Sequence, residues 1–155
     1  MSKPLKFVIA LAIPLILGFI GSYFTRKSVN AWFVNLNKPV FNPPNWLFAP
    51  AWTVLYILMG IAFYLVWQQG YAPNMRLAFV VFAIQLLLNL LWSALFFGLR
   101  NPLLGFVDIV LLWIFILVNI ILFYRLERVA GLLLIPYILW VTFASVLNLS
   151  ILILN

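Results

Sequence analysis

Histidine and cysteine are absent from this chain of 155 residues, and only Asp108 and Glu127 are acidic. Without cysteine no disulfide can form, so the sequence carries no mark of a redox compartment. The two acids lie in different segments, which provides neither a cluster of metal ligands nor a general-base arrangement. The absences therefore disfavour metal-dependent and hydrolytic catalysis, and serines without a candidate base are expected to be packing hydroxyls.

The same absences bear on haem. Haem iron takes His, Cys, Met or Tyr as an axial ligand, and only Met and Tyr occur here. We therefore expect no permanently ligated haem, no metal site and no other cofactor. A metal-free porphyrin, held by stacking and apolar contact alone, remains compatible with the composition.

Charge is also scarce, at 7% of residues against 68% hydrophobic ones. Soluble domains are about half apolar and about a quarter charged, so the lipid bilayer is the expected environment of this chain. The nine Lys and Arg residues give a net charge of +7, but they stand singly or in pairs at the ends of apolar runs. This spacing indicates anchors at the membrane surface and excludes the basic stripe of a nucleic-acid-binding protein.

The apolar runs predict an all-α membrane protein, a single domain over residues 1–155. Each run is long enough to cross a bilayer. The predicted spans are residues 5–24, 50–67, 77–99, 103–124 and 129–154. Most connections are short, so neighbouring helices must run antiparallel and form a five-helix up-down bundle. Five basic residues would lie at one end and four at the other, so the charge asymmetry that orients membrane proteins is absent.

The connection at residues 25–49 is the exception, because it is long and contains Lys38 and several prolines. We expect a structured lid between the first two spans. A short interfacial helix over residues 29–36, with Trp32, Phe33 and Leu36 on one side, would end at Lys38-Pro39. An ordinary solvated loop fits the composition equally well.

Small residues recur at intervals of four in the first span, at Ala10, Pro14, Gly18 and Ser22. Such a stripe lets a second backbone approach closely, and we interpret it as a packing surface. Asp108 follows Pro102 closely in the fourth span. We interpret it as an acid near a helix start, with an intramembrane pairing to Arg100 or to a ligand cation as the alternative.

Aromatic residues make up 18% of the chain and follow helical spacing on three spans. Trp52 and Tyr56 share one face of the second span, Trp92 and Phe96 one face of the third, and Tyr137 and Trp140 one face of the fifth. Together they predict one aromatic pocket. The amides of Gln85, Asn89 and Asn148 are expected to point into the bundle, to orient a ligand or to join helices. We assign Trp67 and Trp113 instead to the membrane interface.

Several motifs resemble a known family, the translocator proteins, also called tryptophan-rich sensory proteins or peripheral-type benzodiazepine receptors (TspO/MBR). In the first half these are Trp32, Leu-Asn-Lys-Pro at 36–39, Phe-Asn-Pro-Pro-Asn-Trp at 41–46, Pro-Ala-Trp-Thr-Val-Leu-Tyr at 50–56 and Met-Gly at 59–60. In the second half they are Gln85, Asn89, Trp92-Ser93 and Phe-Phe-Gly at 96–98, then Pro136-Tyr137, Trp140, Phe143 and Leu147-Asn148. The resemblance covers nearly the whole chain.

The resemblance implies a homodimer and a pocket beneath the first loop that binds porphyrins and isoquinoline-carboxamide or benzodiazepine drugs. The residues that would line this pocket are Phe33, Trp46, Trp52, Tyr56, Asn89, Trp92, Phe96, Trp140, Ala144 and Leu147. Trp52 and Trp140 match the tryptophans that some bacterial relatives use in light-dependent breakdown of protoporphyrin. Animal relatives carry a cholesterol-recognition pattern, a tyrosine followed by a basic residue. Here no basic residue follows Tyr137, which places cholesterol handling in doubt.

The leading hypothesis from the sequence is therefore a membrane receptor or sensor for porphyrin-type tetrapyrroles. A light-dependent porphyrin-degrading enzyme is the first alternative. A tetrapyrrole or lipid transporter is the second, which the absence of internal repeats supports poorly. The absence of a transit-like N-terminal stretch favours a bacterial cell membrane over a mitochondrion.

Overall fold

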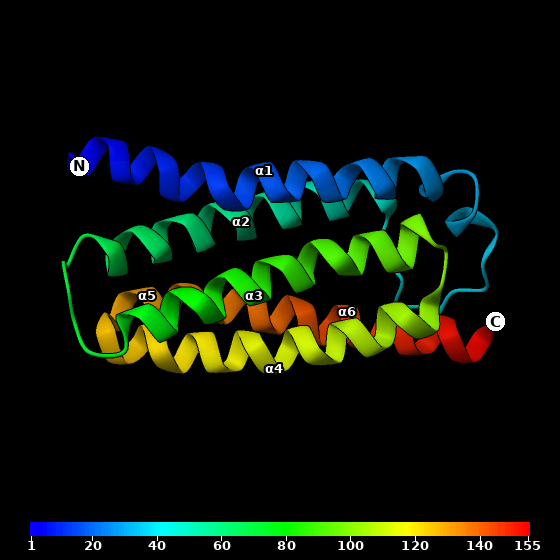
Figure 1. Cartoon of the computed structure of the whole chain (residues 1–155). Helices are drawn as coiled ribbons and strands as arrows, with labels where there is room; N and C mark the ends of the chain where they lie inside the picture. The colour runs from blue at the N-terminus through cyan, green and yellow to red at the C-terminus, as the bar shows by residue number, and fades with distance from the viewer.

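The computed structural model describes all 155 residues, and every regular element in it is helical. Figure 1 shows the long helices side by side, each antiparallel to the next along the chain. The elements are α1 Lys3–Val29, η1 Phe33–Asn35, α2 Asn45–Trp67, α3 Met75–Ser93, η2 Ala94–Gly98, α4 Pro102–Leu126, α5 Arg128–Leu133 and α6 Ile135–Leu154.

Five helical stretches are long and apolar enough to cross a membrane. They hold between 23 and 27 residues, and at about 1.5 Å per residue even about 20 residues span the hydrocarbon core. Helix α3 continues into η2 as the third stretch, and α5 continues into α6 as the fifth. The prediction of an all-α bundle of five membrane-spanning helices is confirmed.

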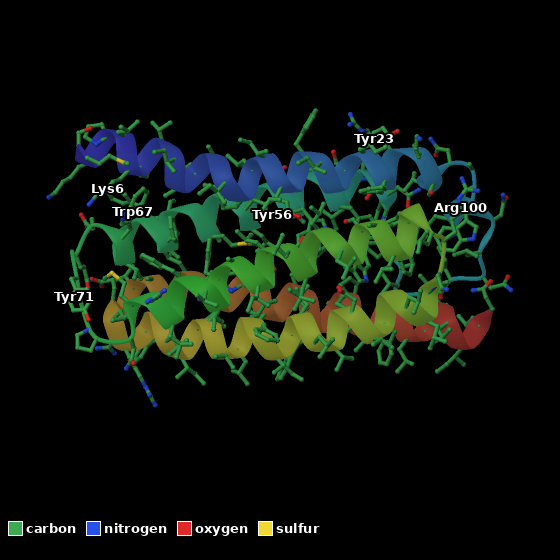
Figure 2. All side chains as sticks on the ribbon, in the orientation of Figure 1. Lys6, Tyr23, Tyr56, Trp67, Tyr71 and Arg100 are labelled. Carbon is green, nitrogen blue, oxygen red and sulfur yellow. The ribbon has the colours of Figure 1, made fainter.

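Polar side chains gather at the two ends of the bundle. In Figure 2, Lys6, Trp67 and Tyr71 lie at one end, Tyr23 and Arg100 at the other, with Tyr56 between them. At the first of these ends, the Gln69 side-chain amide donates a hydrogen bond of 2.7 Å to Glu127. This contact joins the connection after α2 to the connection before α5.

Two of the predicted spans contain breaks in the α-helical pattern. At the end of the third, the Leu99 N–H donates to the Ala94 carbonyl over 2.8 Å, which closes the wider turn of a π-helix. This turn buries the adjacent rings of Phe96 and Phe97 together. The fifth span breaks at Leu134, because Pro136 near the start of α6 has no N–H to continue the ladder.

The connection between α1 and α2 is structured, but the predicted interfacial helix over residues 29–36 is wrong. Val29 belongs to α1, and only the single turn η1 remains. The Lys38 ammonium explains this, since it donates to the carbonyls of Phe33, Val34 and Leu36 at 3.0, 3.2 and 3.2 Å. Carbonyls satisfied by a side chain need no helical partner.

The end of the chain holds this connection in place over the bundle. The Asn37 N–H donates to the Asn155 side-chain oxygen over 3.1 Å, and the Asn155 amide donates back to the Asn37 carbonyl over 2.9 Å. Phe33 is 2% exposed and packs with Phe96 and Phe97 of η2. The connection is therefore a packed cover, as the sequence predicted.

Helices α1 and α2 approach most closely where small residues meet. A Cβ placed on Gly60 would lie 2.8 Å from the Leu11 Cα, so only glycine fits there. Ala10 and Pro14, on the predicted packing stripe, are buried at this level. Further along the stripe, Gly18 lies against the Tyr56 ring and Ser22 borders open space. The stripe is thus a packing surface as far as Gly18, and Gly18 and Ser22 also border the open space.

Candidate functional site

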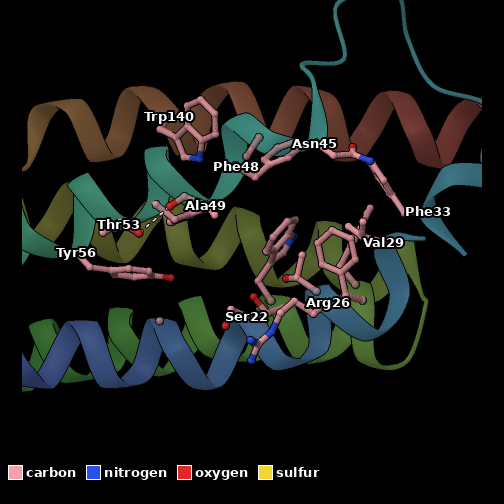
Figure 3. A pocket seen from close by; sticks show the side chains of 18 of the residues that line it. Ser22, Arg26, Val29, Phe33, Asn45, Phe48, Ala49, Thr53, Tyr56 and Trp140 are labelled. Atoms are coloured by element: carbon pink, nitrogen blue, oxygen red, sulfur yellow. Dashed lines mark hydrogen bonds between the residues drawn. The ribbon is translucent and has the colours of Figure 1, made fainter. Parts of the chain in front are cut away.

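A cavity of about 580 Å³ lies within the bundle, at the end covered by the connection between α1 and α2. Figure 3 shows side chains from several elements around it. Its walls come from the second half of α1, the first half of α2, the end of α3 with η2, and α6, while Phe33 of η1 closes the end. Most of the lining residues are hydrophobic.

Eight of the ten predicted ligand-binding residues line this cavity. They are Phe33, Trp52, Tyr56, Trp92, Phe96, Trp140, Ala144 and Leu147. Five elements contribute them: η1, α2, α3, η2 and α6. The structure brings the predicted faces together, while the binding role of each residue stays a prediction.

Trp46 and Asn89 lie elsewhere. Trp46 is 71% exposed at the start of α2, since it is six residues before Trp52 and points away from the lining face. Asn89 is buried behind Tyr56, where it accepts a hydrogen bond of 2.9 Å from the Tyr56 hydroxyl. Neither residue borders the cavity, for reasons of helix phase and of hydrogen bonding, and a role of either in ligand binding stays a prediction.

Trp52 is the centre of the aromatic wall. Its ring centroid lies 5.7 Å from that of Tyr56, 6.5 Å from Trp92 and 6.4 Å from Trp140. The ring planes of Trp52 and Trp140 are 89° apart, whereas Trp52 and Tyr56 are close to parallel at 25°. Faces and edges of aromatic rings thus meet at one wall, and both are favourable surfaces for another π-system.

Below the cavity, a chain of hydrogen bonds joins three helices. The Asn89 amide donates to the Tyr137 hydroxyl over 2.8 Å, and that hydroxyl donates to the Gln85 side-chain oxygen over 2.7 Å. With the bond from Tyr56, this chain runs from α2 through α3 to α6. The buried amides of Gln85 and Asn89 therefore join helices, and the alternative in which they orient a ligand is not supported.

Asn148 and Trp140 differ in whether their polar groups are hydrogen-bonded. The Trp92 indole N–H donates to Asn148 over 3.0 Å, and the Asn148 amide donates to the Pro102 carbonyl over 2.9 Å. The indole nitrogen of Trp140, in contrast, is buried and has no hydrogen-bond partner. Figure 3 shows this indole at the cavity wall. A ligand oxygen near this nitrogen would supply the acceptor that the protein lacks.

The contribution of α1 to the cavity was missed in the sequence. Gly18, Ser22, Thr25 and Arg26 form one wall, together with Leu15 and Phe19. The small residues at intervals of four were the signal, because a stripe that leaves room for a neighbouring backbone also leaves room for a ligand. Arg26 brings a positive charge to the cavity that the sequence had assigned to the membrane surface.

Trp67 and Trp113, both predicted to lie at the membrane interface, occupy different positions along their helices. Trp67 is the last residue of α2, and the Lys6 ammonium lies 5.6 Å from its ring centroid, an arrangement typical of a helix end. Trp113 lies near the middle of α4 and donates to the Thr142 hydroxyl over 2.8 Å. The interface prediction for Trp113 is therefore wrong, since this indole joins α4 to α6 within the span.

Asp108 is 3% exposed, and neither carboxylate oxygen has a hydrogen-bond partner. The Asn101 side chain caps α4 instead, accepting from the Leu104 N–H over 3.1 Å. Arg100 donates to the Ser28 hydroxyl over 3.3 Å, so the predicted pairing of Arg100 with Asp108 is wrong. Asp108 also lies outside the cavity lining.

Five membrane-length helices around one aromatic cavity define a multi-pass integral membrane protein. Comparison with known proteins narrows the class. The model of the TspO/MBR family matches residues 10–154, and the chain belongs to this family.

Relatives along the whole chain agree with this assignment. The chain is 49% identical over 151 residues to the tryptophan-rich protein TspO of Archaeoglobus fulgidus, which covers 97% of both chains. It is 50% identical over 152 residues to the protein of the same name from Chlorobaculum tepidum, covering 97% of this chain and 96% of the relative. The translocator protein of Bos taurus is 34% identical over 138 residues, covering 88% of this chain and 82% of the relative.

Proposed function

We propose that this protein is a membrane receptor or sensor that binds metal-free, porphyrin-type tetrapyrroles in the cavity beneath the α1–α2 connection. The observation that carries the proposal is a space of about 580 Å³ bordered by the indoles of Trp52, Trp92 and Trp140. Pockets for small organic ligands typically measure about 300 to 1,000 Å³ and are lined mainly by apolar and aromatic groups. A large flat molecule matches both the size and the lining.

The orientation of the rings supports a planar ligand. Trp52 and Trp92 are tilted by 34° to each other, and Trp140 stands nearly perpendicular to Trp52. A planar π-system inserted among them would meet a ring face on one side and a ring edge on another, and each such contact contributes about 0.5 to 1.5 kcal/mol beyond burial. Isoquinoline-carboxamide and benzodiazepine drugs, which the family resemblance implies, share these planar aromatic parts.

Titration of the purified protein with protoporphyrin tests the proposal, with quenching of tryptophan fluorescence as the readout. Trp140→Ala should weaken binding about five- to thirtyfold, which corresponds to about 1 to 2 kcal/mol of lost aromatic contact. Trp113→Phe is the matched control, because Trp113 lies outside the cavity lining. Absence of quenching, or quenching that both Trp52→Phe and Trp140→Ala leave unchanged, would refute the proposal.

A second candidate function is light-dependent degradation of the bound porphyrin. The close contacts of Trp52 with Trp140 and with Tyr137, each 6.4 Å between ring centroids, favour it, since they provide neighbouring electron donors at the cavity. Illumination of the protein with protoporphyrin under air separates this candidate from simple binding. If the photoproducts equal those formed in detergent alone, and Trp52→Phe changes nothing, the enzymatic candidate is rejected.

We further infer that the protein works as a homodimer in a bacterial-type cell membrane. The microbial relatives are 49% and 50% identical to the chain, against 34% for the bovine one. The dimer follows from the family resemblance. Light scattering of the detergent-solubilised protein measures its mass, and a monomeric mass at all protein concentrations would contradict the dimer.

A further inference from the structure

The cavity lining carries one formal charge, and this charge is positive. Arg26 is the only charged residue among the side chains that border the cavity. Both acids of the chain lie elsewhere: Asp108 is buried in α4 outside the lining, and Glu127 is bonded to Gln69 at the opposite end of the bundle. A ligand in the cavity therefore meets a cation without a neighbouring carboxylate.

The other basic residues at this end of the bundle are engaged with the protein. Lys38 donates to three backbone carbonyls of the cover, and Arg100 donates to Ser28. The Lys27 ammonium lies 4.6 Å from the Tyr23 ring centroid, and Tyr23 is exposed on the outer face of α1. Arg26 is therefore the one basic residue at this end that borders the cavity.

The contacts of Arg26 leave its fork of N–H donors free. Arg26 is exposed, and its guanidinium carbon lies 5.5 Å from the centroid of the Phe19 ring, a cation–π contact that uses none of its N–H groups. Nearby hydroxyls do not compete, because Ser22 donates to the Phe19 carbonyl over 2.7 Å and Thr53 to the Ala49 carbonyl over 2.7 Å. An unpaired guanidinium recognises carboxylate groups through two parallel hydrogen bonds.

We infer that the cavity selects its ligand as an anion: a flat, apolar molecule that carries a carboxylate, with the carboxylate held by Arg26 and the ring system among the tryptophans. Arg26 stands in the last turn of α1, so the charged group of the ligand faces the end of the bundle, where water is available. The apolar part then occupies the deeper space beside Trp52 and Trp140. This inference rests on the proposed function and adds the chemical class of the ligand.

A basic residue in this turn also has an ordinary role, since it complements the negative end of the helix dipole. Lys27 shares that role, because it stands in the same turn and lies outside the cavity lining. The two residues therefore form a matched pair. Loss of Lys27 removes a charge from the helix end alone, whereas loss of Arg26 removes it from both the helix end and the cavity.

The experiment compares protoporphyrin, which has two carboxylates, with its uncharged dimethyl ester, in the wild type and in Arg26→Gln, Arg26→Lys and Lys27→Gln. We expect the wild type to bind the acid about three- to tenfold more tightly than the ester, the range for a partly solvated ion pair. Arg26→Gln should abolish this preference and Arg26→Lys should keep part of it. Lys27→Gln should retain it in full.

Salt provides a second measurement that needs no variant. The preference of the wild type for the acid should decrease between low salt and about 0.5 M salt, because ions screen a pair at the bundle end. If the wild type binds acid and ester equally, or Arg26→Gln retains the preference, the inference fails while the proposed function stands. If neither compound binds, the proposed function itself fails.

Discussion

Replacement of Tyr137 by phenylalanine should destabilise the bundle more than any other loss of a single hydroxyl. The Tyr137 hydroxyl makes two hydrogen bonds at once, accepting from Asn89 over 2.8 Å and donating to Gln85 over 2.7 Å. Tyr137→Phe removes both bonds without changing the packing of the ring. It leaves the Asn89 amide and the Gln85 oxygen without their partner at a buried position.

The magnitude follows from the two bonds. Hydrogen bonds between helices in membrane proteins contribute about 0.6 kcal/mol on average, and a buried polar group left unpaired costs about 1 to 3 kcal/mol. We therefore expect Tyr137→Phe to lower the free energy of unfolding by about 1 to 4 kcal/mol. Tyr56→Phe breaks only the single bond of 2.9 Å to Asn89 and should cost about half as much.

Thermal or denaturant-induced unfolding in detergent measures both variants, followed by circular dichroism at a helical band. The double variant completes a cycle, and its cost should be less than the total of the single variants because both act on Asn89. Stability of Tyr137→Phe equal to that of the wild type would refute the reasoning. So would a larger loss in Tyr56→Phe than in Tyr137→Phe.

Three further predictions concern other positions. Gly60→Ala places a Cβ 2.8 Å from the Leu11 Cα, so it should lower the free energy of unfolding by about 1 to 3 kcal/mol, measured in the same unfolding experiment. Asp108→Asn removes a buried carboxyl without a partner and should raise the unfolding midpoint, and an unchanged or lower midpoint would show that the carboxyl is satisfied. Trp46→Ala should leave the affinity for protoporphyrin within about twofold in a fluorescence titration, because Trp46 lies outside the cavity lining; a loss as large as that of Trp140→Ala would contradict this placement.

The membrane spans and the aromatic faces could be predicted because hydrophobic length and helical period are local properties of the sequence. Trp52 and Tyr56 are four residues apart, as are Trp92 and Phe96, so each pair had to share a helix face. The meeting of these faces in one cavity was a hypothesis from the shared periodicity, and the family resemblance supplied the list of lining residues.

Other features depend on contacts between distant residues and leave no local signal. The exclusion of Asn89 from the lining follows from its bonds with Tyr56 and Tyr137, which are 33 and 48 positions away. The wall formed by α1 did have a local signal, the small residues at intervals of four, but the same signal marks a packing surface, and only the neighbouring helices decide which of the two it becomes. The π-turn that buries Phe96 and Phe97 likewise arises from packing and not from a residue pattern.

The hydrogen bonds between Asn37 and Asn155 have a practical consequence for work with the purified protein. The two residues are 118 positions apart, yet the C-terminal side chain holds the cover of the cavity. An affinity tag or fluorescent fusion placed directly after Asn155 would therefore alter the very surface under which ligand affinity is measured. Figure 1 places the N-terminus at the opposite end of the bundle, so a tag attached there leaves the cover untouched.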